Sequence, residues 1–158
     1  VLAAPDIAAA EATAGVCFGA EDLAADLGAR RTKAGEEVLY ARQRTLVAAR
    51  AGGASAFDTV FADIEDLEGL REDAVYARQL GYDGKLAIHP AQVSVINDAF
   101  TPDAEDVEWA RRVLDAIADA DGDVGAVRVD DEMIDGPLVA QAERIRERAG
   151  ERWETVNN

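Results

Sequence analysis

The stretch Gly15-Val16-Cys17-Phe18-Gly19-Ala20-Glu21-Asp22-Leu23 decides how this chain folds. Its apolar start predicts a buried strand over 16–18, and the run stops at a glycine followed by two carboxylates. In a parallel α/β protein, the end of such a strand points into the face where ligands bind. A carboxylate at this position is a candidate for holding a hard cation such as Mg²⁺. The alternative is that Glu21 and Asp22 only begin the next helix, whose dipole favours negative charge there.

Outward from this strand, the chain alternates between strands and helices. Apolar runs predict strands at 16–18, 56–61 and 85–88, with a further short strand at 127–129. Turn residues and apolar periodicity predict helical segments, including the end of a helix before the first strand, at 1–14, 21–28, 36–51, 67–80, 91–98, 103–119 and 137–149. The alternation predicts an α/β fold with parallel strands joined by right-handed crossovers. Three such strands are few for a free-standing sheet, so we expect part of a larger barrel or open sheet.

Local signals set the expected helix faces and ends. Gly81 is predicted to end the 67–80 helix. Thr101 and Pro102 predict the start of the 103–119 helix, because a capping hydroxyl precedes proline at the first helical position. The buried face of the 36–51 helix is predicted to comprise Val38, Leu39, Leu46 and Val47.

Composition narrows the classes of partner. The chain has 158 residues, long enough for one domain with a hydrophobic core, and its net charge is −16. This charge disfavours nucleic acid and anionic membrane surfaces as partners. The only lysines are Lys33 and Lys85, among abundant acids. Such a surface is typical of a halophilic protein, although an acidic mesophilic protein fits as well.

Cysteine usage and hydropathy indicate the compartment. Cys17 is the single cysteine, so no internal disulfide can form, which fits a reducing cytoplasm. No apolar run approaches the roughly 20 residues of a membrane span, and no signal peptide is visible. We therefore expect a soluble, cytoplasmic protein.

Four sequence blocks carry a family resemblance. They are FGAEDLAADLG at 18–28, AFDTVFADIEDLEGL at 56–70, GYDGKLAIHPAQVSVINDAFTP at 81–102 and DEMIDGP at 131–137. In this order they resemble the second half of the HpcH/HpaI aldolase and citrate lyase β-subunit family, which includes malyl-CoA, methylmalyl-CoA and citramalyl-CoA lyases. The resemblance covers nearly the whole chain, and the third block is long and specific.

The resemblance implies a (β/α)₈ TIM-barrel fold, of which this chain would be a partial barrel. Its three strands would correspond to strands six to eight. Residues 1–122 would form the C-terminal part of the barrel, 123–150 a C-terminal helical lid and 151–158 a frayed tail. A full barrel needs roughly 250 residues, so about the first half would be lacking. That half would carry a metal-binding Glu and an Arg that grips the substrate carboxylate.

The resemblance also implies a reaction. Family members are Mg²⁺-dependent carbon–carbon lyases that cleave or form a 3-hydroxyacyl-CoA, with a CoA thioester and a 2-oxo acid as substrates. The acyl group would be malyl, methylmalyl, citramalyl or citryl. A malyl-CoA thioesterase is an alternative, and so is a non-catalytic remnant or split-barrel partner subunit. Homotrimers are common in the family, so we expect a homo-oligomer or a partner that supplies the missing half-barrel.

Three residues receive roles from the motif match. Asp22 would be a metal ligand, and Glu21 would face a second shell or solvent. Asp135 in DEMIDGP would be a general acid or base, delivered from the lid into the neighbouring subunit's site. The alternative for Asp135 is a helix N-cap before Gly136-Pro137, and one residue can play both parts.

The remaining candidates concern CoA. Arg30, Arg31 and Lys33 form the densest positive cluster, which would suit the phosphates of CoA, although a solvated loop fits nearly as well. His89, the only histidine, and Pro90 follow the 85–88 strand, where they shape the loop or contact the CoA side. A further set of acids near the same face has no assigned chemistry: Asp58, Asp63 and Asp66.

Overall fold

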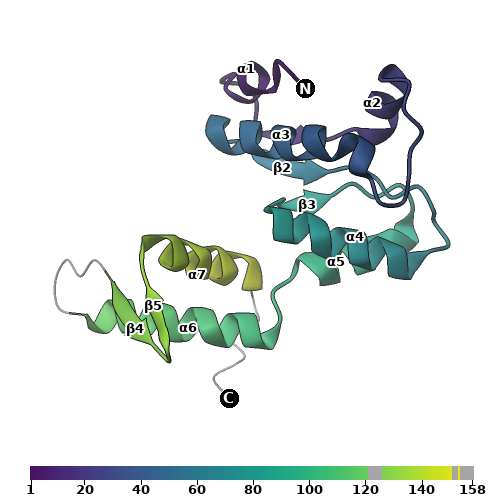
Figure 1. The fold of residues 1–158 in the computed structure, drawn as a ribbon. Coiled ribbons are helices and arrows are strands. Elements are labelled where there is room, and N and C mark those ends of the chain that lie inside the picture. Colours follow the sequence, from purple (N-terminus) through teal and green to yellow (C-terminus); the bar gives the residue numbers. More distant parts are fainter. Residues whose placement is uncertain (121–125, 151–152, 154–158) are drawn as a thin grey trace. The chain divides into compact units, whose positions relative to one another are not determined.

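A parallel three-stranded sheet lies at the centre of the first hundred residues (Figure 1). The computed structural model describes residues 1–120, 126–150 and 153. The chain divides into two units, Val1–Phe100 and Thr101–Asn158. The predicted division into barrel, lid and tail stays a prediction, since residues 121–125 and nearly all of 151–158 lie outside the described part.

The sheet has the predicted topology. Its strands are β1 (Gly15–Cys17), β2 (Ser55–Asp58) and β3 (Gly84–Lys85), in the order β1-β2-β3 and parallel throughout. The register pairs Gly15 with Ser55 and Asp58 with Lys85. The structure confirms an α/β chain with a parallel sheet. The three strands do not close a barrel.

Five helices accompany the sheet among the described residues of the first unit: α1 (Ala4–Ala8), α2 (Ala20–Asp26), α3 (Glu36–Gly52), α4 (Leu67–Leu80) and α5 (Pro90–Phe100). The hydrophobic core contains small residues of both helices and sheet, among them Ala49 of α3, Ala77 of α4 and Ala56 of β2. Gly81 ends α4 in the left-handed conformation with φ 107°, as predicted.

Two predicted strands are too long. The segments 56–61 and 85–88 leave the sheet early, because the side chain of Gln92 binds their backbone groups. Gln92 Nε2 donates to the Phe61 carbonyl at 2.9 Å, and its Oε1 accepts from the Ile88 amide at 2.9 Å. A fully buried amide thus replaces the strand ladder beyond Asp58 and Lys85.

The buried face of α3 differs from the prediction in part. Val38 and Leu46 are buried, but Val47 is 62% exposed. The helix instead turns alanines and the guanidinium of Arg42 toward the sheet, where Arg42 binds Asp58. Apolar periodicity missed this face because a charged residue occupies a buried position.

The opposite face of the sheet carries Phe57. Its ring lies beside two glycines: a Cβ added at Gly15 or Gly84 would lie 3.2 or 3.1 Å from ring carbons of Phe57. Cys17 is exposed. In a complete barrel this face would line the interior.

The second unit packs α6 (Ala104–Asp119) and α7 (Gly136–Ala149) with an antiparallel hairpin of β4 (Val127–Val129) and β5 (Glu132–Ile134). The strand at 127–129 is confirmed, whereas its partner was not predicted. Asp130 adopts a left-handed conformation in the turn, with φ 53°, where a glycine is usual. The sequence therefore lacks the glycine-containing dipeptide that commonly marks a hairpin.

The start of α6 also differs from the prediction. Asp103, and not Thr101, is the N-cap, because its Oδ1 accepts from the Asp106 amide at 2.8 Å. Pro102 therefore precedes the cap. Within the described residues, no helix combines the length and apolar character of a membrane span.

Candidate functional site at the strand ends

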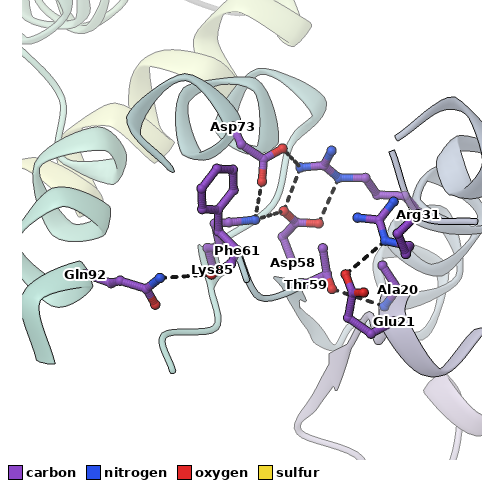
Figure 2. A network of polar contacts seen from close by, with 10 residues as sticks. Ala20, Glu21, Arg31, Asp58, Thr59, Phe61, Asp73, Lys85 and Gln92 are labelled. Carbon is purple, nitrogen blue, oxygen red and sulfur yellow. Dashed lines mark hydrogen bonds and ion pairs between the residues drawn. The ribbon is translucent and has the colours of Figure 1, made fainter. Parts of the chain in front are cut away.

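Polar side chains gather where the three parallel strands end (Figure 2). β1 leads into Glu21 and Asp22 in the first turn of α2. β2 ends at Asp58, which Thr59 follows, and β3 ends at Lys85. The carboxyl ends of parallel strands are the edge at which such folds bind ligands.

Two acids and two bases form a closed ring at this edge. Asp58 accepts from Arg42 Nε at 2.8 Å, from Arg42 Nη2 at 2.6 Å and from Lys85 Nζ at 2.8 Å. Asp73 of α4 closes the ring, since it accepts from Arg42 Nη2 at 3.0 Å and contacts Lys85 Nζ. The Asp58 and Lys85 side chains are fully buried, and the ring is neutral overall.

Contacts within the ring shift the pKa values of Asp73 and Arg42 toward their charged forms. Burial alone would raise the pKa of Asp73, but Lys85 and Arg42 hold it below its ordinary value. Burial would likewise lower the pKa of Arg42, and Asp58 and Asp73 raise it instead. The Tyr82 hydroxyl donates to the Arg42 carbonyl at 2.7 Å, which fixes the helix turn that carries the guanidinium.

Asp22 is exposed and sits in the first turn of α2, where the helix dipole favours an acid. Its Oδ2 lies back toward the strand end, 4.0 Å from where a Cβ on Gly19 would be. The geometry is compatible with both predicted readings of this acid. Among the described residues, no three His, Cys, Asp or Glu side chains are grouped closely enough to hold a metal. Asp22 is therefore one hard oxygen donor and not a complete metal site.

Glu21 and the basic loop at 30–35 are tied together. Arg31 Nε donates to Glu21 Oε1 at 2.9 Å, and Arg31 also contacts Glu37. Lys33 Nζ pairs with Asp66 Oδ2 at 2.8 Å. Two of the three predicted CoA-contacting bases are thus engaged by carboxylates, whereas Arg30 is exposed and forms no ion pair with a described residue.

Glu37 organises this loop through Thr32. The Thr32 amide donates to Glu37 Oε1 at 3.0 Å, and the Thr32 hydroxyl donates to Oε2 at 2.7 Å. These hydrogen bonds lower the pKa of Glu37 from 4.5 to about 2, and the bond from the Thr32 backbone amide has the largest effect.

Glu37 should make the free energy of unfolding depend on pH in the acid range. The folded state binds the Glu37 proton more weakly than the unfolded state does. Its contribution is therefore present above pH 4.5 and is lost as the pH falls toward about 2. Urea unfolding across this window should show a shallower pH slope for Glu37→Gln than for the wild type. Glu36→Gln, which removes a charge from the same turn without touching Thr32, is the control. Equal slopes for wild type and Glu37→Gln would contradict the assignment.

A pocket of about 300 Å³ opens beside the ring. Its walls include Arg31 and Lys33 from the basic loop, and Thr59 and Asp66 from the segment that joins β2 to α4. The Lys33–Asp66 ion pair links these two walls. Mixed charge and a link across the walls suit a polar ligand.

His89 has a local structural contact. Its Nδ1 accepts from the Ala91 amide at 3.2 Å, and its carbonyl accepts from the Gln92 amide at 3.0 Å, so it shapes the start of α5 before Pro90. Both residues are exposed. The loop-shaping alternative thus has direct contacts, and a contact of His89 or Pro90 with CoA remains a prediction.

Asp135 occupies the N-cap position of α7, yet its side chain makes no capping hydrogen bond. It is exposed and belongs to the second unit. The side chain is therefore not used by its own helix, and its catalytic role remains a prediction.

Sequence reasoning missed the buried ring and Thr59. The available signals were weak: an acid closes the apolar run at Asp58, and Lys85 is one of only two lysines. Arg42 and Asp73 carried no signal, because each lies among many surface charges of a helix.

The sequence of the first unit matches a known family. The HpcH/HpaI aldolase/citrate lyase family matches residues 1–90, more than half of the chain. The chain belongs to this family. The resemblance drawn from the four sequence blocks is thereby confirmed.

Two curated relatives and one solved structure show which members of the family this chain resembles. It is 40% identical over 136 residues to the citrate lyase subunit beta of Haemophilus influenzae, covering 85% of this chain and 47% of that protein. It is 39% identical over 131 residues to the mitochondrial citramalyl-CoA lyase of Mus musculus, covering 82% and 39%. CitE of Mycobacterium tuberculosis, in complex with magnesium, acetoacetate and coenzyme A, superposes with a TM-score of 0.81 at 41% identity. That match covers 93% of this chain and 56% of CitE.

The chain spans about half the length of the curated relatives it matches. Its three strands therefore correspond to part of the sheet of the CitE structures. The activity, substrates and partners of the whole protein are matters for proposal.

Proposed function

We propose that this chain contributes the strand-end acid Asp22 to a Mg²⁺-dependent carbon–carbon lyase acting on a 3-hydroxyacyl-CoA. The observation that carries the proposal is the match to CitE of Mycobacterium tuberculosis, whose structure holds magnesium, acetoacetate and coenzyme A. The acyl group would be malyl, methylmalyl, citramalyl or citryl.

Asp22 fits the metal by its chemistry. Mg²⁺ is usually held by one or two carboxylates with substrate and water completing the shell, and Asp22 offers one exposed carboxylate at the ligand-binding edge. When bound, the ion would stabilise negative charge on an oxygen of the 2-oxo acid. A second carboxylate from outside the described residues would complete the protein ligands.

The residues around Asp22 favour an accessible, fixed carboxylate at this position. Arg31 pairs with Glu21 as well as with Glu37, whereas Asp22 forms no ion pair with a described residue. The buried ring holds the end of β2 against β3, so the edge that faces the substrate is rigid. Preorganised charges of this kind cost no rearrangement during reaction.

Asp135 is the proposed general acid. When the bond between the α and β carbons breaks, the hydroxyl gives its proton to a base and its carbon becomes the carbonyl of the 2-oxo acid. The electron pair of the broken bond passes to the thioester fragment as an enolate. The enolate then takes a proton from a carboxylic acid. An Asp at the start of α7 with no capping bond is free for this task in a neighbouring subunit of a homo-oligomer.

A product assay tests the proposed reaction and separates it from thioester hydrolysis. The protein expressed from its native gene is incubated with malyl-, citramalyl- and citryl-CoA, with and without MgCl₂. Lyase activity releases a 2-oxo acid, detected as its phenylhydrazone, and no free thiol. Thioesterase activity releases free CoA thiol, detected with a thiol reagent. Mg²⁺-independent release, or no release from any thioester, would contradict the proposal.

Arg30 is the base that the structure leaves available for CoA phosphate. Arg30→Ala should raise the KM for the CoA thioester about tenfold, because it removes a charge-assisted hydrogen bond to phosphate. Lys33→Ala should change this KM less, since Lys33 is already paired with Asp66. Steady-state kinetics of the two variants test the difference. A larger effect of Lys33→Ala would assign phosphate contact to Lys33 instead.

A further inference from the structure

The helix that carries Asp22 has no N-terminal cap of its own. Its N-cap residue is Gly19, in an extended conformation, and it forms no side-chain cap. The first amides of a helix have no partner within the helix, and a glycine has no side chain with which to accept from them. One of these amides, that of Ala20, is buried with its residue fully inaccessible to solvent.

Thr59 from the neighbouring strand end supplies the missing acceptor. The Ala20 amide donates to Thr59 Oγ1 at 3.1 Å, and Figure 2 shows the two residues facing each other. Thr59 is 4% exposed, so this hydrogen bond is shielded from water. Without it, a buried donor would be left unsatisfied.

Thr59 is itself held in place by the two residues that precede it along the chain. Asp58, the preceding residue, is fixed by three hydrogen bonds from Arg42 and Lys85. One residue earlier, the carbonyl of Phe57 accepts from the Phe18 amide at 2.9 Å, which joins β2 to the end of β1. The hydroxyl is therefore presented at a fixed point relative to the start of α2.

We propose that Thr59 is a positioning residue for Asp22. By fixing the amide of Ala20, it sets where α2 begins, and Asp22 follows two residues later in the same turn. Asp22 Oδ2 lies 4.0 Å from the position that a Cβ on Gly19 would take, and Gly19 directly precedes the amide that Thr59 binds. This inference rests on the proposed metal role of Asp22. It predicts that the Thr59 hydroxyl contributes to Mg²⁺ affinity although it does not touch the ion.

Calorimetric titration with MgCl₂ tests the inference on the protein expressed from its native gene. Thr59→Val keeps the shape and removes the acceptor, and Thr59→Ser keeps the hydroxyl. We expect the Kd for Mg²⁺ to rise about tenfold in Thr59→Val, as for loss of an outer-shell partner. In Thr59→Ser it should stay within about twofold of the wild type, since the acceptor is retained. Wild-type affinity in Thr59→Val, or equal loss in both variants, would overturn the proposal.

Asp22→Asn, titrated beside them, separates this inference from the proposed function. If Asp22→Asn binds Mg²⁺ as the wild type does, the metal assignment fails and the inference fails with it. If Asp22→Asn loses Mg²⁺ while Thr59→Val retains full affinity, only the positioning role fails.

Amide exchange gives a second readout that does not depend on activity. The Ala20 amide should exchange slowly in the wild type and in Thr59→Ser, and markedly faster in Thr59→Val. Should Thr59→Val fail to fold, Thr59→Ala removes the same acceptor without the second methyl, and the same losses are expected of it. Rapid exchange at Ala20 in the wild type would overturn the proposal whatever the variants show.

Discussion

Replacing Lys85 by methionine should destabilise the fold by about 3–5 kcal/mol, the usual cost of removing one partner from a buried ion pair. The side chain of Lys85 is fully buried and contacts both acids of the ring, Asp58 and Asp73. Methionine keeps the length of the side chain but leaves the buried carboxylate of Asp58 and the half-buried one of Asp73 to share Arg42. The uncompensated charge therefore accounts for the loss.

The other lysine of the chain provides the control. Lys33 has a side chain that is 71% exposed, and it pairs with Asp66 at the surface. Lys33→Met should therefore change the free energy of unfolding far less than Lys85→Met does, because exposed ion pairs contribute little. Urea unfolding of the two variants beside the wild type measures both values. A loss for Lys85→Met no larger than that for Lys33→Met would show that the ring does not support the fold.

Replacing Asp22 by asparagine should reduce Mg²⁺-dependent cleavage at least about 100-fold, because a first ligand to the metal matters at least as much as its outer-shell partners. Asparagine keeps the shape of the side chain and removes its negative charge. The unfolding midpoint should hardly change, since the charge is exposed and an acid in the first helical turn adds only about 0.3–1 kcal/mol.

This variant also decides between the two readings of Asp22. If the acid only begins α2, Asp22→Asn should lower stability slightly and leave cleavage unchanged. Asp26→Asn, at the exposed last residue of the same helix, controls for loss of one negative charge. Kinetics and unfolding of both variants are required, and equal cleavage by wild type and Asp22→Asn would remove Asp22 from the metal site.

The fold was predictable wherever one local signal sufficed. The apolar run at 16–18 and the stripe ending at Gly81 gave β1 and α4, because each depends on residues close in sequence. The predicted strand lengths were wrong where the side chain of Gln92 forms hydrogen bonds with backbone groups of two separate segments. These hydrogen bonds join residues that are far apart in the chain, and a single sequence gives no sign of them.

The candidate site divides in the same way. Asp22 was found because it follows a strand directly. The ring was missed because its partners lie 12 to 31 residues apart along the chain, and the sequence alone does not reveal which charged side chains meet in the interior. The basic loop was found, but the carboxylates that engage Arg31 and Lys33 were not. Halophilic origin was inferred from composition alone and stays a prediction.

The central claim is that Asp22 holds Mg²⁺ for carbon–carbon cleavage, and a calorimetric titration with MgCl₂ tests it most directly. The account predicts saturable binding at one Mg²⁺ per protein subunit in the wild type and its loss in Asp22→Asn. Saturable binding of equal affinity in both proteins would contradict the account, because the metal would then be held by other residues.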